Sequence, residues 1–303
     1  MRKAIYITLF IALLIAACQP TSSAWQDGKK TIVVTYSILG ALVNNLVNSE
    51  ANVVVLIPNG QDPHEWEPSA KDIETLMKAD LIVQNGLGLE GGLEKALSQA
   101  ASAGVKSFVA SDHITVRKVG QGEGIPNAGT GQLVGASDPH VWTDPLTMKQ
   151  VVSALSDQIK ADLGIDLSMR AQDLESQLDS LNSEITTQVA SLPEVNRKLV
   201  TGHESLGYFA DRYGFKLVGA IIPSLNTQAE VSAADMAALK TLIQENQVKA
   251  IFSEVGTPKS ISDSIGRETG VNVVELATHF LPLDGSYFTF MRDLSQTIVE
   301  NLR

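Results

Sequence analysis

The sequence holds a single cysteine, and this scarcity excludes an intrachain disulfide framework, because a disulfide needs a second thiol. Basic residues are also few: 23 Lys and Arg face 34 Asp and Glu, for a formal net charge of −11 over 303 residues. No stripe of Lys and Arg is present to neutralise phosphates, so no nucleic-acid partner is expected. The apolar run at residues 4–17 is 14 residues long. It falls short of the ~20 residues that a membrane-spanning helix needs.

That short run has the features of a cleaved export signal. Residues 1–3 supply two cations before it, and it ends in small residues. Residues 15–18, Ile-Ala-Ala-Cys, resemble the lipobox of bacterial lipoproteins, in which the cysteine becomes the lipid-modified first residue. We therefore expect residues 1–17 to be a signal peptide and Cys18 to carry lipid. The exported protein would then be anchored on the extracytoplasmic face of a bacterial membrane. A buried free cysteine is the alternative.

The remaining chain predicts an α/β fold with two lobes. After a polar tether at residues 18–30, short β-branched or apolar runs alternate with segments of helical periodicity, which is typical of βαβ units and parallel sheets flanked by helices. The same alternation occurs in both halves of the chain. We expect strands at residues 31–36, 52–57, 80–84, 106–109, 198–201, 216–222, 249–253 and 271–276.

One long helix is expected to join the lobes. Between Leu174 and Val189, apolar residues recur at steps of three and four, and the helical pattern fills most of residues 166–192. A helix of this length acts as a rigid strut between an N-terminal lobe at 31–165 and a C-terminal lobe at 193–303. Residues 116–137 are rich in glycine and form a predicted loop.

Histidines follow the predicted strands. His64 and His140 each come directly after Asp-Pro and stand two residues before a tryptophan, and His203 ends the strand at 198–201. Asp284 lies in a similar position near the end of the chain. Ligands of open α/β sheets bind outside the carboxyl ends of strands. We interpret these four residues as ligands that converge on one divalent metal ion in the cleft between the lobes. Ordinary surface histidines in turns are the alternative for the two Asp-Pro-His motifs.

With these motifs, the sequence resembles the metal-binding solute receptors, usually lipoproteins, of bacterial ABC importers for zinc or manganese. The resemblance covers essentially the whole mature chain. It rests on residues 62–68, 138–142, 201–204 leading into 208–209, 252–254 and 284–287. It implies two α/β lobes joined by a long helix with one ion between them.

The resemblance also implies a ligand set. The first two ligands of the family match His64 and His140. The third is histidine in zinc-type members and often glutamate in manganese-type members, and His203 occupies that position. The fourth, an aspartate where present, matches Asp284. Many zinc-type members carry a loop rich in histidine before the second ligand, whereas residues 116–137 contain no histidine. This departure weakens a purely zinc-specific interpretation.

Four further residues are expected to support the site. Glu254 ends a strand and is placed to orient a ligand histidine through its other ring nitrogen, with a surface acid near a helix as the alternative. His279 lies five residues before Asp284 and is expected to be structural or supporting, with a ligand role left open. Trp66 and Trp142 are expected to wall the site from water, although core packing alone would explain them.

Taken together, the motifs predict a monomeric receptor that captures extracytoplasmic metal and delivers it to the membrane permease of an ABC importer, without catalysis. Zinc is the first choice and manganese the second, because nitrogen-rich four-coordinate sites suit zinc. A zinc hydrolase with an open coordination position and a metal-binding surface adhesin are the alternatives.

Overall fold

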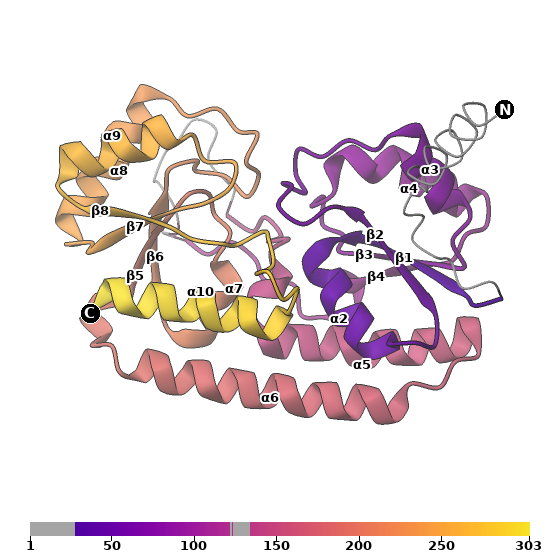
Figure 1. Cartoon of the computed structure of the whole chain (residues 1–303). Coiled ribbons are helices and arrows are strands. Elements are labelled where there is room, and N and C mark those ends of the chain that lie inside the picture. The colour runs from indigo at the N-terminus through magenta and orange to yellow at the C-terminus, as the bar shows by residue number, and fades with distance from the viewer. Residues whose placement is uncertain (1–27, 122, 124–133) are drawn as a thin grey trace, which may run out of the picture.

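The computed structural model describes residues 28–121, 123 and 134–303. The chain forms two α/β lobes that lie side by side, with one long helix running along the base of both (Figure 1). The predicted signal peptide, Cys18 and most of the tether lie outside the described residues, as does the middle of the glycine-rich loop. Within the described ranges, no helix is both long and apolar enough to cross a membrane.

The N-terminal lobe is built on a parallel sheet with the strand order β2-β1-β3-β4. Every residue of the central strand β1 is buried, as expected for an apolar strand covered on both faces. The strands are β1 (Thr31–Tyr36), β2 (Asn52–Ile57), β3 (Leu81–Gln84) and β4 (Ser107–Val109). The helices of this half are α2 (Ser37–Val47), α3 (Ala70–Met77), α4 (Glu94–Ser102) and α5 (Pro145–Leu163).

The C-terminal lobe repeats this arrangement with the order β6-β5-β7-β8, again parallel. The chain reverses its direction of winding between β5 and β7, and ligands of open α/β sheets bind at the carboxyl ends of the strands at such a reversal. The strands are β5 (Lys198–Thr201), β6 (Lys216–Ala220), β7 (Ala250–Ser253) and β8 (Asn272–Glu275). The helices are α7 (Gly207–Tyr213), α8 (Ala233–Glu245), α9 (Lys259–Thr269) and α10 (Tyr287–Leu302).

The two lobes are joined by α6 (Ser168–Ala190), a helix of 23 residues, or about 34 Å at helical rise. It packs against α5 of the first lobe and α10 of the second. Its buried residues recur at helical spacing: Ala171, Leu174, Leu178, Leu181, Ile185 and Val189. The expected fold class, two parallel-sheet lobes joined by one long helix, is confirmed.

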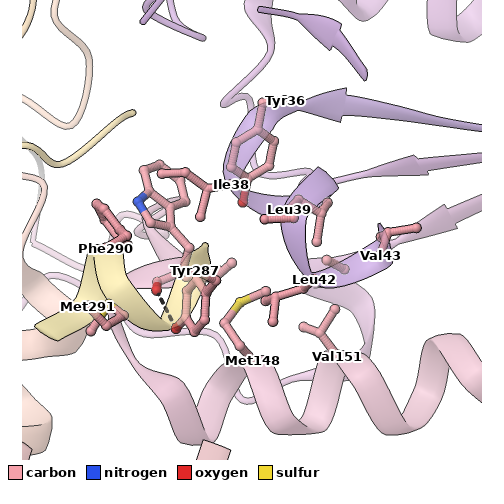
Figure 2. Packing of buried hydrophobic residues seen from close by; sticks show 14 of the residues in the cluster. Tyr36, Ile38, Leu39, Leu42, Val43, Met148, Val151, Tyr287, Phe290 and Met291 are labelled. Carbon is pink, nitrogen blue, oxygen red and sulfur yellow. Dashed lines mark hydrogen bonds between the residues drawn. The ribbon is translucent and has the colours of Figure 1, made fainter. Parts of the chain in front are cut away.

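The lobes also share a hydrophobic core. Tyr287, Phe290 and Met291 of α10 pack among residues of α2 and α5 (Figure 2). The Tyr287 hydroxyl donates a hydrogen bond of 2.9 Å to the Trp142 carbonyl. Apolar packing is dense and deforms little, so this shared core fixes how the strand ends of the two lobes face one another. A second, smaller apolar cluster lies within the C-terminal lobe.

Candidate metal site

Four histidines meet in the cleft between the lobes. His64 and His140 come from loops of the N-terminal lobe, after β2 and before α5. His203 and His279 come from the loops after β5 and β8. One ring nitrogen of each lies within 4.8 Å of the others, and all four side chains are buried. The Nε2 atom of His140 lies 3.1 Å from Nε2 of His203 and 3.3 Å from Nε2 of His64.

The structure thus brings together three of the four residues interpreted as ligands and places the fourth elsewhere. Asp284 is exposed, and its carboxylate accepts hydrogen bonds from the Ser286 amide at 3.0 Å and the Thr289 hydroxyl at 2.7 Å. Asp284 thus belongs to the turn that begins α10 and lies outside the cluster, and its role as a ligand stays a prediction. His279 is the fourth member of the cluster. The sequence signal was present, since His279 follows closely on β8 as His203 follows β5.

Hydrogen bonds around the rings define which nitrogen carries the proton. His140 Nδ1 lies 2.9 Å from Asp138 Oδ1, and an ionised carboxylate can only accept. His279 Nδ1 lies 2.8 Å from the Thr278 hydroxyl, whose own proton is directed to Glu254 Oε2 at 2.7 Å. Both rings therefore carry the proton on Nδ1, an assignment made from the network. Their Nε2 lone pairs are left free to face the cluster.

Converging lone pairs repel one another unless a cation lies between them. An added proton, which would make a ring cationic, is disfavoured there, because burial lowers the pKa of His64, His140 and His279 well below the usual value and neighbouring histidines lower it further. A divalent metal fits better. Zinc–nitrogen bonds of about 2.0–2.1 Å in a tetrahedron place neighbouring nitrogens roughly 3.3–3.4 Å apart. The two Nε2–Nε2 distances, 3.1 and 3.3 Å, lie close to that edge length.

Two buried carboxylates lie next to the Nδ1 atoms of two of the histidines. Glu254 accepts hydrogen bonds from the Gly202 amide at 2.9 Å and from the Ser205 and Thr278 hydroxyls at 2.7 Å each. Its Oε2 lies 3.2 Å from His203 Nδ1, although the ring is not aligned for a straight hydrogen bond. Burial alone would raise the pKa of Glu254, but His203 and the hydrogen-bond donors outweigh it and lower that pKa. Glu254 therefore lies beside a histidine of the cluster, and its role in orienting that ring stays a prediction.

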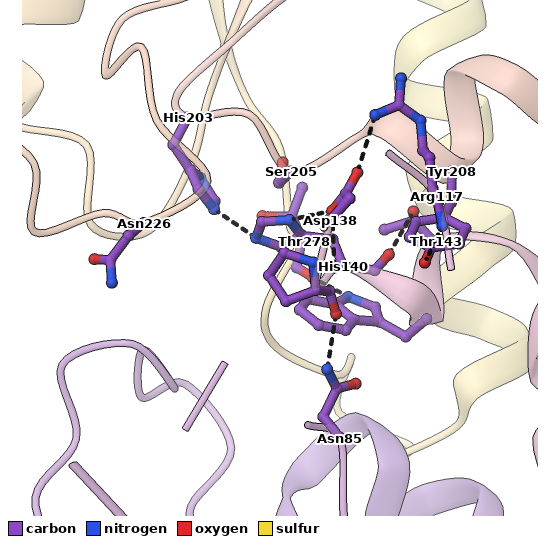
Figure 3. A network of polar contacts seen from close by, with 12 residues as sticks. Asn85, Arg117, Asp138, His140, Thr143, His203, Ser205, Tyr208, Asn226 and Thr278 are labelled. Carbon is purple, nitrogen blue, oxygen red and sulfur yellow. Dashed lines mark hydrogen bonds and ion pairs between the residues drawn. The ribbon is translucent and has the colours of Figure 1, made fainter. Parts of the chain in front are cut away.

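Asp138 is the second carboxylate, and the sequence interpretation did not assign it a role. Its Oδ1 accepts both the His140 amide and the His140 ring N–H at 2.9 Å, as part of the network in Figure 3. Burial raises the pKa of Asp138 to about 6, even though Arg117 lies close by. The Asp-Pro-His motif itself is the sequence feature that could have identified Asp138. In the other copy, Asp62 Oδ1 accepts the His64 amide at 2.9 Å but the described residues give His64 Nδ1 no partner.

The two tryptophans differ in placement. Trp142 is fully buried, and its ring centroid lies 5.3 Å from those of both His140 and His279. Its indole N–H donates to the Thr278 carbonyl at 2.7 Å, so it packs between the cluster and the shared core. Trp66 is half-buried and packs against the edge of that core. The side-chain amide of Asn85, directly after β3, donates from Nδ2 to the Pro139 carbonyl at 2.8 Å and fixes the turn that carries His140 (Figure 3).

Comparisons with known proteins show which family the chain belongs to. Curated relatives include the manganese-binding lipoprotein MntA of Halalkalibacterium halodurans, 27% identical over 98% of this chain and 97% of the relative. The zinc uptake protein ZnuA of Bacillus subtilis is 30% identical over 88% of this chain and 85% of its own. The solved structure of the zinc-binding protein TroA from Treponema pallidum superposes with a TM-score of 0.76 at 29% identity, covering 91% of this chain and 99% of that one. A family model described as zinc-uptake complex component A, periplasmic, matches residues 32–301. The chain therefore belongs to the ZnuA family of metal-uptake proteins.

Proposed function

We propose that this protein is the extracytoplasmic receptor of an ABC metal importer, binding one divalent ion through His64, His140, His203 and His279 and passing it to the membrane permease. The observation that carries the proposal is the cluster of four buried rings, each with one nitrogen within 4.8 Å of the others, in which His140 Nε2 lies 3.1 Å from His203 Nε2 and 3.3 Å from His64 Nε2. Relatives are named as manganese- or zinc-binding lipoproteins and uptake proteins, which supports the same role.

Zinc is the preferred cargo, with manganese second. Four neutral imidazoles around a divalent ion give an inner charge of +2 and no oxygen donor, where the sequence had suggested three imidazoles and a carboxylate. Zinc accepts such nitrogen-rich tetrahedral sets, whereas manganese favours carboxylate, carbonyl and water oxygens. Asp138 and Glu254, just behind the rings, offset the charge without contributing an oxygen ligand.

A role without catalysis follows from the same ligand set. Zinc hydrolases bind the metal through three protein ligands and keep a position for water, whereas four protein ligands complete a tetrahedron. A cargo ion needs tight, reversible binding and no open position. An adhesin on the same fold would use its outer surface, and the fold does not decide that role.

Attachment to the membrane is proposed through a lipid on Cys18, with the described lobes acting as a monomer above it. Named lipoproteins among the relatives support this arrangement. Mass spectrometry of the mature N-terminus tests it directly. A Cys18→Ala variant is expected to leave the membrane fraction, and unaltered membrane association would contradict the anchor.

Metal content and thermal unfolding test the receptor function. Purified protein is expected to hold one equivalent of zinc, and zinc is expected to raise the midpoint of unfolding more than manganese does. A ligand that binds only the folded state adds RT ln(1 + [L]/Kd), or about 4 kcal/mol at a thousandfold excess over Kd. Absence of metal together with no shift in zinc would reject the proposal. An equal shift with manganese would reject the zinc preference alone.

A further inference from the structure

Arg117 contacts Asp138, the carboxylate that accepts the ring N–H of the candidate ligand His140, and it also contacts a helix of the other lobe. Its guanidinium is buried, and Nη1 lies 3.4 Å from Asp138 Oδ2. The other oxygen of Asp138 holds the ring N–H of His140 (Figure 3). On its far side, Arg117 Nε donates to Asp211 of α7 at 2.8 Å. A single side chain thus joins the carboxylate behind His140 to a helix of the C-terminal lobe.

The backbone makes the same connection. The Arg117 amide donates to the Tyr208 hydroxyl of α7 at 2.9 Å, and the Arg117 carbonyl accepts the Asp138 amide at 3.0 Å. Asp138 is therefore held by Arg117 through both main chain and side chain. Tyr208 and Asp211, one turn apart on α7, hold Arg117 in turn.

Gly207, the first residue of α7, shows how closely the lobes approach at this point. A Cβ atom on Gly207 would lie 2.1 Å from Asp138 Oδ2 and 2.6 Å from Arg117 Nη1. Neither atom can move far, because Asp138 is fully buried and the Arg117 side chain is only 6% exposed. The carboxylate behind His140 is thus confined between a guanidinium and the backbone of the opposite lobe.

We propose that Arg117 is a positioning residue for His140, and that it makes the orientation of this ring depend on contact between the lobes. While α7 stays against Arg117 and Asp138, the carboxylate holds the His140 ring with Nε2 aimed at the metal. We call the contact of α7 with residues of the N-terminal lobe the seam. When the lobes separate at this seam, Asp138 loses its confinement and the His140 ring is free to turn. Release of metal is thereby coupled to separation of the lobes. This inference rests on the proposed function.

The chain offers a matched control. Arg212 of α7 forms a two-pronged ion pair with Asp144, the residue that caps α5, at 2.7 and 2.9 Å. It is likewise an Arg–Asp pair between the lobes, and both arginines line one surface pocket. Neither Arg212 nor Asp144 contacts a histidine of the cluster. Loss of Arg212 should therefore weaken the seam without disturbing the support of His140.

The experiment measures zinc release from loaded protein by chelator chase, together with the visible spectrum of the cobalt-loaded form and the unfolding midpoint of the metal-free form. Arg117→Gln and Gly207→Ala are each expected to speed zinc release on the order of tenfold, the low end of effects for groups that orient metal-binding histidines. Both should shift the cobalt bands, and Arg117→Lys should recover part of the loss. Arg212→Gln should lower the unfolding midpoint while leaving release and spectrum unchanged.

Two results would overturn the inference: zinc release from Arg117→Gln and Gly207→Ala at the wild-type rate, or an equal acceleration in Arg212→Gln. The second would mean that general weakening of the seam, and not support of His140, governs release. If Arg117→Gln does not fold, Asp211→Asn replaces it, since this carboxylate is 63% exposed and the buried guanidinium of Arg117 keeps its ion pairs with Asp138 and Glu123. Failure of the wild-type protein to bind zinc would reject the proposed function instead, so the two failures are distinguishable.

Discussion

The fourth candidate ligand provides the sharpest test of the site, through a paired substitution of His279 and Asp284. Both lie in the loop between β8 and α10, but only His279 belongs to the buried cluster. Structural zinc sites bind with about 10–16 kcal/mol, so one ligand of four accounts for roughly 2.5–4 kcal/mol. At 1.4 kcal/mol per factor of ten, His279→Ala should weaken zinc binding roughly 60- to 700-fold. Asp284→Ala should leave the affinity unchanged.

The assay is a competition titration against a chelator of known affinity, with circular dichroism to establish that each variant folds. His279→Ala removes a buried ring from a loop and not from a strand or helix, so the metal-free fold should persist. The reasoning would be refuted if Asp284→Ala weakened zinc binding and His279→Ala did not. That outcome would mean that the loop rearranges on binding and brings the carboxylate, not the imidazole, to the ion.

Three further predictions concern the other histidines. His140→Ala should lower zinc affinity by orders of magnitude while the metal-free protein stays folded, and a titration with unchanged affinity would count against its role. His203→Glu should shift the preference toward manganese by adding an anionic oxygen donor; competition between the two ions would detect the change, and an unmoved ratio would reject it. The metal-free protein should lose stability as pH falls below about 6.5, because His64, His140 and His279 have lowered pKa values when folded and bind protons more readily when unfolded. Urea unfolding in chelator measures this loss, and it should be smaller in a His279→Asn variant; an equal pH dependence in both proteins would show that His279 does not contribute.

Much of the architecture could be read from the sequence because it depends on local patterns. Short β-branched or apolar runs such as residues 31–36 predict strands, and the structure forms β1 at those residues and buries it completely. The steps of three and four from Leu174 to Val189 predict one long helix, and these residues form the buried face of α6. The Asp-Pro-His motifs and the position of His203 at a strand end likewise identified three members of the cluster.

The fourth member could not be chosen in this way. His279 and Asp284 are five residues apart in one loop, and both follow the same strand. Which of them enters the cleft depends on where the chain turns to begin α10, and Ser286 and Thr289 draw Asp284 into that turn. Such a choice depends on hydrogen bonds formed only once the helix is in place, so periodicity and spacing carry no sign of it.

The sequence by itself determined two parallel-sheet lobes, the long helix between them and the strand ends at which ligands gather. Only the tertiary structure decided that four imidazoles converge, that Asp138 and Glu254 stand behind them, and that Arg117 meets Gly207 across the seam. The physical reason is the separation along the sequence of the residues that must interact. Secondary structure follows from neighbours within a few residues, whereas the site joins loops more than 200 residues apart, and their meeting is fixed by the core that both lobes share.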